Sequence, residues 1–219
     1  MKKIIILLFA TVLFANEIGI LIYKKGLVKV QHQNSIKKKS LNINSKILRG
    51  DKISTYNSIA TIKLNDNSII KLDKYSTIKF GNKIYQENGR IYYHIIHRKQ
   101  KTLKIATNFT TIGVKGTIFI VEANTTKKVA LSKGKISLTS LKGKYKIHRK
   151  KILDEYEAFK AGLNNEFESY KEILYKEFIE YKKSFDLKEN HIVTFYNNEV
   201  YETKLNSKKE FEYFEKNFK

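Results

Sequence analysis

The chain has 219 residues, a formal net charge of +22 and no cysteine. Without cysteine it can form no disulfide, and it cannot be a lipoprotein anchored through a modified N-terminal cysteine. Its stability must therefore come from its own hydrophobic core, and its length suffices for one good-sized domain or two small ones.

The positive charge is confined to one part of the sequence. Residues 16–149 hold 28 Lys and Arg against 6 Asp and Glu, whereas residues 150–219 hold 13 against 15. A field of this size attracts polyanions and is sensitive to salt. We therefore divide the chain into residues 1–15, a basic region 16–149 and a C-terminal region 150–219.

Residues 1–15 have the pattern of a secretory signal peptide. Lys2 and Lys3 precede an apolar run over residues 4–14, and Ala15 supplies a small residue at the expected cleavage site. The pattern predicts a periplasmic or secreted protein. A signal anchor extended by residues 18–22 is the alternative, although Asn16 and Glu17 interrupt the apolar run.

Residues 16–149 are predicted to form many short strands. In residues 60–64, Ala60, Ile62 and Leu64 share one face and Lys63 lies on the other. Similar runs occupy residues 26–30, 69–72, 77–80, 91–96, 103–107, 117–121, 129–132 and 136–139. Turn-forming residues separate these runs about every ten positions, which predicts a mainly β domain of coiled or sandwiched short strands.

The apolar spacing changes after residue 151. Large apolar residues recur in an eleven-residue pattern over residues 152–185, which is typical of a straight stripe along one helix. The predicted interaction stripe consists of Tyr156, Phe159, Phe167, Tyr170, Phe178 and Tyr181. A long amphipathic helix would bury this stripe against the β domain, a partner or a second copy of the chain.

The last thirty residues predict a small hairpin and a terminal helix. Residues 192–196 and 200–205 read as strands joined by a turn at Asn197 and Asn198. Residues 208–217 read as a helix with Ser207 at its N-cap and with Phe211 and Phe214 on one face.

The order of the β motifs resembles the FecR-type periplasmic domain over about residues 26–139. The quoted motifs are LRGDKIST at residues 48–55, Gly-Arg-Ile at 89–91, VKGTIFIV at 114–121 and the Gly134 turn between two strands. This resemblance implies an all-β fold and an interaction function, and it implies no reaction. The chain is similar to the stand-alone exported members of this family. The cytoplasmic segment and membrane helix of the members that regulate sigma factors are not found in its sequence.

We expect structural roles for the motif residues. Gly50, Gly89 and Gly134 should adopt turn conformations with positive φ or allow close packing. Gly116 should let neighbouring backbone approach, and Asp51 should bind local amides in a turn. Thr117 belongs to the same Gly-Thr-x-Phe motif, in which Phe119 should fill the core.

No catalytic, cofactor-binding or metal-binding motif is recognised. His94 and His97 form the only close histidine pair, and on a strand they point to opposite faces. No phosphate-binding loop or nucleophile elbow occurs. The chain is therefore predicted not to be an enzyme and to need no cofactor.

One covalent modification is predicted. Residues 122–126, Glu-Ala-Asn-Thr-Thr, match the acid-x-Asn-x-Ser/Thr acceptor of some bacterial periplasmic glycosylation systems. Asn124 would carry the glycan. The same pattern also arises by chance in a chain rich in Asn and Thr.

The sequence favours a non-enzymatic periplasmic interaction, signalling or scaffold protein. Its partner would dock on the aromatic stripe, which could also mediate self-association. The alternative function is binding of anionic envelope polymers or lipid head groups through the basic region, and a merely solvated basic surface also remains open. No nucleic-acid partner is expected for an exported protein, and the mature chain has no predicted membrane span.

Overall fold

The computed structural model describes residues 17–96, 102–150 and 177–218. These residues form twenty strands and one helix, α3 (Lys209–Asn217). The first ten strands are β1 (Glu17–Lys25), β2 (Val28–Gln31), β3 (Lys38–Ser40), β4 (Lys46–Leu48), β5 (Lys52–Thr55), β6 (Ile59–Leu64), β7 (Ile69–Leu72), β8 (Thr77–Phe80), β9 (Ile84–Asn88) and β10 (Arg90–Ile95). The next ten are β11 (Leu103–Ala106), β12 (Thr110–Val114), β13 (Thr117–Ala123), β14 (Lys127–Lys133), β15 (Ile136–Ser140), β16 (Tyr145–Lys150), β17 (Glu177–Lys182), β18 (Ser184–Leu187), β19 (His191–Tyr196) and β20 (Glu199–Lys204).

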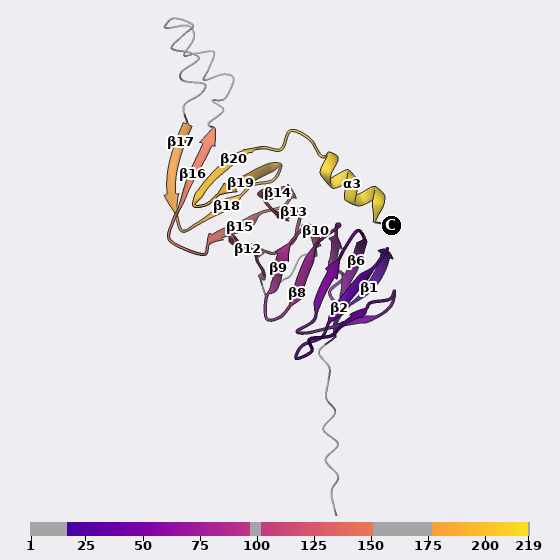
Figure 1. Cartoon of the computed structure of the whole chain (residues 1–219). Coiled ribbons are helices and arrows are strands. Elements are labelled where there is room, and N and C mark those ends of the chain that lie inside the picture. The colour runs from indigo at the N-terminus through magenta and orange to yellow at the C-terminus, as the bar shows by residue number, and fades with distance from the viewer. Residues whose placement is uncertain (1–16, 97–101, 151–176, 219) are drawn as a thin grey trace, which may run out of the picture.

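The strands form two sheets that pack face to face along the length of the molecule (Figure 1). Sheet A has the order β17-β16-β20-β19-β14-β13-β10-β7-β6-β1-β4, and sheet B has the order β18-β15-β12-β11-β9-β8-β5-β2-β3. Within the described ranges, only the β9–β11 and β16–β20 pairs are parallel. The mainly β prediction is confirmed.

Period-2 alternation places one face of each strand in the core. In β6, Ala60, Ile62 and Leu64 are buried and Lys63 is exposed. One continuous apolar cluster joins residues of both sheets, from Leu21 in β1 to Val200 in β20. Each large side chain buried there contributes about 1.5–3 kcal/mol, so the core compensates for the lack of disulfides.

The long helix predicted for residues 152–185 is wrong at its C-terminal end. Residues 177–182 form β17, which pairs with β16, and residues 184–187 form β18, which pairs with β15. Phe185 and Leu187 are buried while Ser184 and Asp186 are exposed, the alternation of a half-buried strand. The only helix in the described part of the chain is the nine-residue α3, and residues 152–176 lie outside the described residues.

The strands after residue 176 continue the two sheets of the basic region. In sheet A, β19 pairs with β14; in sheet B, β18 pairs with β15. The predicted hairpin is present as β19 and β20, with Asn197 at a φ of 55° in its turn. The terminal helix is also present, but Lys208 takes the N-cap position, and the Ser207 hydroxyl accepts the Lys209 N–H at 3.2 Å.

Residues 18–22, considered above as an extension of a membrane anchor, belong to strand β1. This strand lies between β4 and β6, and its Leu21 is fully buried. Among the residues that the structure describes, no helix is long and apolar enough to cross a membrane.

Candidate interaction surface

Helix α3 lies against the outer face of sheet A, on the side away from the sandwich core (Figure 1). Its Phe211 and Phe214 side chains are buried on Tyr92 of β10, with ring centroids 6.3 Å and 5.6 Å from the Tyr92 ring. Phe218, which follows the helix, packs against Phe214 with the rings tilted and their centroids 4.9 Å apart. A second apolar cluster, separate from the main core, is therefore formed by a surface of the sheet and the last turns of the chain.

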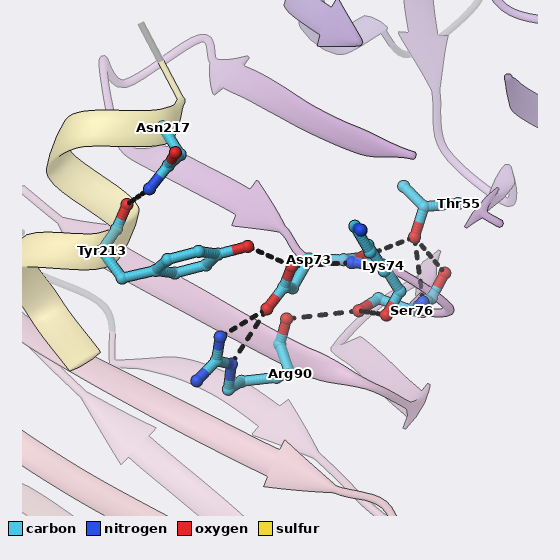
Figure 2. A network of polar contacts seen from close by, with 7 residues as sticks. All are labelled: Thr55, Asp73, Lys74, Ser76, Arg90, Tyr213 and Asn217. Carbon is cyan, nitrogen blue, oxygen red and sulfur yellow. Dashed lines mark hydrogen bonds and ion pairs between the residues drawn. The ribbon is translucent and has the colours of Figure 1, made fainter. Parts of the chain in front are cut away.

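A polar network fixes the helix at one edge of this cluster (Figure 2). Asp73, which follows β7, accepts hydrogen bonds from Arg90 Nε at 3.0 Å and Arg90 Nη2 at 2.7 Å. Its other oxygen accepts the Tyr213 hydroxyl of α3 at 3.0 Å and the Lys74 N–H at 2.9 Å. The Arg90 guanidinium also lies 4.9 Å from the ring centre of Tyr213, which adds a cation–π contact.

Hydrogen bonds to the turn that carries Asp73 hold the backbone of this network in place. Thr55 donates its hydroxyl hydrogen bond to the Asp73 carbonyl at 2.6 Å and accepts the Ser76 N–H at 2.9 Å. The Ser76 hydroxyl donates to the Arg90 carbonyl at 3.2 Å. These bonds fix the backbone at both Asp73 and Arg90, so the two charged side chains are pre-positioned for Tyr213.

Side chains of sheet A donate hydrogen bonds to backbone carbonyls at the C-terminal end of α3. Lys71 Nζ donates to the Phe214 carbonyl at 2.9 Å, and the Thr61 hydroxyl donates to the Phe218 carbonyl at 3.5 Å. A cation at this end of a helix also interacts favourably with the helix dipole. The sheet therefore binds the helix through rings, charges and terminal carbonyls together.

A second aromatic group lies on the outer face of sheet A, on β17, β19 and β20. We call Ile179, Tyr181, Tyr196 and Tyr201 the tyrosine face; their exposed fractions are 42%, 62%, 61% and 36%. Tyr201 stacks on His148 at 4.3 Å and donates its hydroxyl hydrogen bond to Glu199, which also pairs with Lys146 at 3.0 Å. Tyr196 packs edge-on against Tyr201 at 5.6 Å. The Tyr196 and Tyr201 rings are thus restricted by neighbouring side chains while remaining open to solvent.

The residues of the quoted motifs lie at turns and in the core. Asp51 is 1% exposed; one oxygen accepts the Leu48 N–H at 2.9 Å and the other lies 2.9 Å from His32 Nδ1. Thr117 and Phe119 are both buried in β13. A side chain at Gly134 would come within 2.7 Å of the Gly116 carbonyl, so these two motif glycines pack against each other.

Residues 51–144 match the family model described as FecR protein. The chain contains a FecR-type domain. The fold resembles two crystal structures of a "putative anti-sigma factor" from Parabacteroides distasonis ATCC 8503, with TM-scores of 0.52 and 0.51 at 12% and 13% identity. The aligned region covers 75% of this chain in both cases and 65% and 64% of the compared chains. A comparison with curated proteins finds no match.

Gly89 is the position in the FecR-type domain where the need for glycine can be tested most clearly. It has a φ of 88°, and an added Cβ would lie 2.4 Å from Ser76 Cα. We expect Gly89→Ala to lower the free energy of unfolding by about 2–3 kcal/mol, because the backbone conformation is strained and the neighbouring chain must move. Gly81→Ala is the control, since a Cβ there meets nothing closer than 3.5 Å. Equal urea midpoints for the two variants would contradict the expectation.

Asn124 lies in the exposed turn between β13 and β14 of the FecR-type domain, and its glycosylation remains a prediction. Its side-chain oxygen accepts the Gly89 N–H at 2.8 Å. A glycan on the amide nitrogen leaves this carbonyl intact, so both roles are compatible. We expect protein from native periplasm to exceed its sequence mass, and Asn124→Gln and Thr126→Ala each to remove the excess. An intact mass equal to the unmodified mature chain would refute the modification.

The predicted interaction stripe is not present as one helical face. Four of its members, Tyr156, Phe159, Phe167 and Tyr170, lie outside the described residues. Phe178 and Tyr181 belong to strand β17 rather than to a helix. Within the described part of the chain, no cluster of three His, Asp or Glu side chains could hold a metal ion.

Sequence reasoning missed the side chains that hold α3. The sequence pattern does not single out Asp73, Arg90 or Tyr213. Their signal is weak because Asp73 and Tyr213 are separated by 140 positions. The predicted apolar face of the terminal helix, Phe211 and Phe214, was the one feature that pointed towards this contact.

The tyrosines of this surface predict a pH dependence. Burial, with a smaller effect of Glu215, raises the pKa of Tyr92 to about 12. Burial also raises the pKa of Tyr213, to which Asp73 adds. An unfolded tyrosine ionises near pH 10, so this stabilisation is complete below about pH 10 and is lost as the pH rises towards 12.

We therefore expect the free energy of unfolding to fall between about pH 10 and pH 12, together with a late-titrating tyrosine signal in the ultraviolet. Tyr92→Phe should remove part of both effects, because phenylalanine cannot ionise. If the wild type and this variant show the same alkaline loss, Tyr92 does not contribute to it.

Proposed function

We propose that the chain is a non-enzymatic regulatory protein of the cell envelope that acts by binding a protein partner. The match of residues 51–144 to the FecR family carries this proposal. The fold likeness to a "putative anti-sigma factor" supports a signalling role of the same general kind. No reaction is proposed.

The proposed location is the periplasm. The basic start, apolar run and small residue of residues 1–15 support export and cleavage after Ala15. The participation of residues 17–25 in sheet A supports the same boundary, because a cut after Ala15 would leave the whole of β1 in the mature fold.

The tyrosine face is the surface that we propose for the partner. Tyr181 and Tyr196 are more than 60% exposed, although neighbouring side chains already restrict the Tyr201 ring beside them. Tyrosine is enriched at protein interfaces, because a ring that is already ordered buries a large area at low entropic cost. In the strand register the Lys146–Glu199 ion pair lies between Tyr181 and Tyr196, so the surface also offers polar groups to a partner.

The position of α3 favours the same surface. The helix covers sheet A as far as Ile192 near the start of β19, and the tyrosine face begins with Tyr196 at the end of the same strand. A partner on the tyrosine face would therefore lie beside the helix and would have no need to displace it. The docked helix supplies a fixed boundary to the binding surface.

Site-specific photo-crosslinking in intact cells tests this proposal. A photoreactive phenylalanine analogue is placed at Tyr181 or Tyr196, and the same analogue at Tyr75 is the control, because Tyr75 is also 61% exposed but lies in the turn between β7 and β8. We expect one protein to be captured at the first two positions and not at the third. Equal capture at all three positions, or none at Tyr181 and Tyr196, would contradict the proposal.

A further inference from the structure

The outer face of sheet B carries a row of lysines that no helix in the described part of the chain covers. In the strands of this sheet the buried residues, such as Val30, Ile53 and Ile78, point to the core. Their neighbours in sequence point outward. We call the outward residues Lys29, Lys38, Lys52, Lys79 and Lys104 the lysine face.

Strand pairing aligns part of this face into one track that runs across the strands and follows the twist of the sheet. Across β3, β2, β5 and β8, Lys38 pairs with Gln31, Gln31 with Lys52, and Lys52 with Lys79. The same line continues through Tyr85, Ala106, Thr111 and Thr139 on β9, β11, β12 and β15. Of these, Ala106 is buried. Neighbouring strands are about 4.8 Å apart, so the track is about 34 Å long.

The lysines of the lysine face are poorly compensated within the chain. Lys52 and Lys79 stand directly opposite each other, an arrangement of like charges that destabilises a sheet. Glu87 pairs with Lys52. Within the described ranges, no carboxylate forms an ion pair with Lys38, Lys79 or Lys104. Sheet A differs, because its Lys71 and Arg90 are engaged by α3 and Asp73.

We propose that the lysine face binds a linear acidic polysaccharide laid along this track. Carboxylates of the polymer would meet Lys38, Lys52 and Lys79, and the hydroxyls of Thr111 and Thr139 would bond to sugar hydroxyls further along. Tyr85, which is 38% exposed and pairs with Lys79, offers a ring against the apolar face of a sugar. This function is additional to the protein partner proposed above.

The track fits a polymer better than a lipid surface. Apart from the Tyr85 ring, its outward residues are lysines, a glutamine, two threonines and Ala106. Peripheral membrane binding normally adds inserted apolar side chains to the basic charge, and the track presents none on its lysine half. Nucleic acid would gain from stacking on several aromatic rings, whereas the track offers one.

Binding of alginate oligomers, a uniform carboxylated polysaccharide, tests the proposal with the mature chain at low salt. The triple variant Lys38→Gln/Lys79→Gln/Lys104→Gln removes three charges from the lysine face. The triple variant Lys63→Gln/Lys144→Gln/Lys204→Gln removes three exposed charges elsewhere. We expect about a tenfold loss of affinity for the first variant, because each lost lysine–carboxylate contact removes a small part of the binding free energy. We expect less than a twofold loss for the second variant, because its lysines do not contact the polymer. Circular dichroism and urea midpoints confirm that both fold.

Binding measurements with other ligands identify the chemistry that the lysine face recognises. Uncharged dextran should not bind, and Tyr85→Ala should weaken alginate binding while leaving binding to phosphatidylglycerol vesicles unchanged. Three results would overturn the proposal: no alginate binding, an equal loss in both triple variants, or tighter binding to the vesicles or to single-stranded DNA than to alginate. An equal loss would show that only net charge matters.

Discussion

Replacing Asp73 with alanine is expected to release helix α3 from sheet A and to lower the free energy of unfolding by about 2–4 kcal/mol. The Asp73 side chain is 11% exposed, and its carboxylate accepts hydrogen bonds from Arg90, Tyr213 and the Lys74 N–H. Burial alone would lower the pKa of Arg90, but the hydrogen bonds and charge of Asp73 raise it. Without Asp73, a charged guanidinium would remain partly buried beneath aromatic rings without its hydrogen-bonded carboxylate, and the charge of Glu210 would compensate for it only in part.

The measurement is urea unfolding together with hydrogen exchange of the α3 amides. The amides of residues 211–217 should lose protection, while those of β13 and β14 should keep theirs at low urea. Asp186→Ala is the control, since Asp186 and its partner Lys135 are 49% and 68% exposed and such a pair is worth at most about 1 kcal/mol. Unchanged protection of α3 in Asp73→Ala would show that the aromatic cluster alone holds the helix.

Replacing Phe119 with alanine is expected to cost about 3–5 kcal/mol, the largest loss that we predict for a single residue. Phe119 is fully buried in β13 and stacks on Tyr93 of the neighbouring strand, with ring centres 4.9 Å apart. The Tyr93 hydroxyl in turn donates to Gln86, whose amide donates to the Gly89 carbonyl. The cavity would therefore lie beside a buried hydrogen-bond network that joins both sheets.

Thermal and urea unfolding of Phe119→Ala and Phe119→Leu measure this effect. Leucine keeps most of the volume and should cost far less than alanine. If alanine and leucine destabilise the domain equally, the loss arises from the ring stacking itself and the cavity explanation is wrong.

The strands of the basic region could be predicted because their signal is local. Ala60, Ile62 and Leu64 alternate with polar neighbours, and a turn follows within a few residues, so the pattern needs no knowledge of the partner strand. Other strands were missed, among them the interior strands β1, β12 and β16 and the short edge strand β3. The reason is clearest for β3. Its three residues are Lys38, Lys39 and Ser40, all exposed, and only pairing with β2 makes them a strand.

The helix prediction failed at residues 177–187 because the spacing there is ambiguous. Phe178, Tyr181 and Phe185 are three and four positions apart, which fits one face of a helix as well as two short strands. Pairing of β17 with β16 and of β18 with β15 decides between them, and both partners precede residue 151. Tertiary pairing of this kind overrides a local periodic signal.

The interaction surface could be predicted only in part. The apolar side of the terminal helix was evident from Phe211 and Phe214, but the place where it docks was not. Asp73, Arg90 and Tyr213 come together because β7 and β10 are neighbours in sheet A and the chain returns to them at its end. Contacts between such distant positions leave no repeat or motif in a single sequence.

The affinity of the crosslinked partner for the purified chain tests the central claim most directly. We predict that Tyr181→Ala/Tyr196→Ala weakens binding by about thirtyfold or more, since each exposed anchor ring should be worth more than 1 kcal/mol. Tyr75→Asn should leave the affinity unchanged, because it removes an equally exposed ring and asparagine tolerates the positive φ at that position. An unchanged affinity in the double variant would contradict the assignment of the tyrosine face as the partner surface.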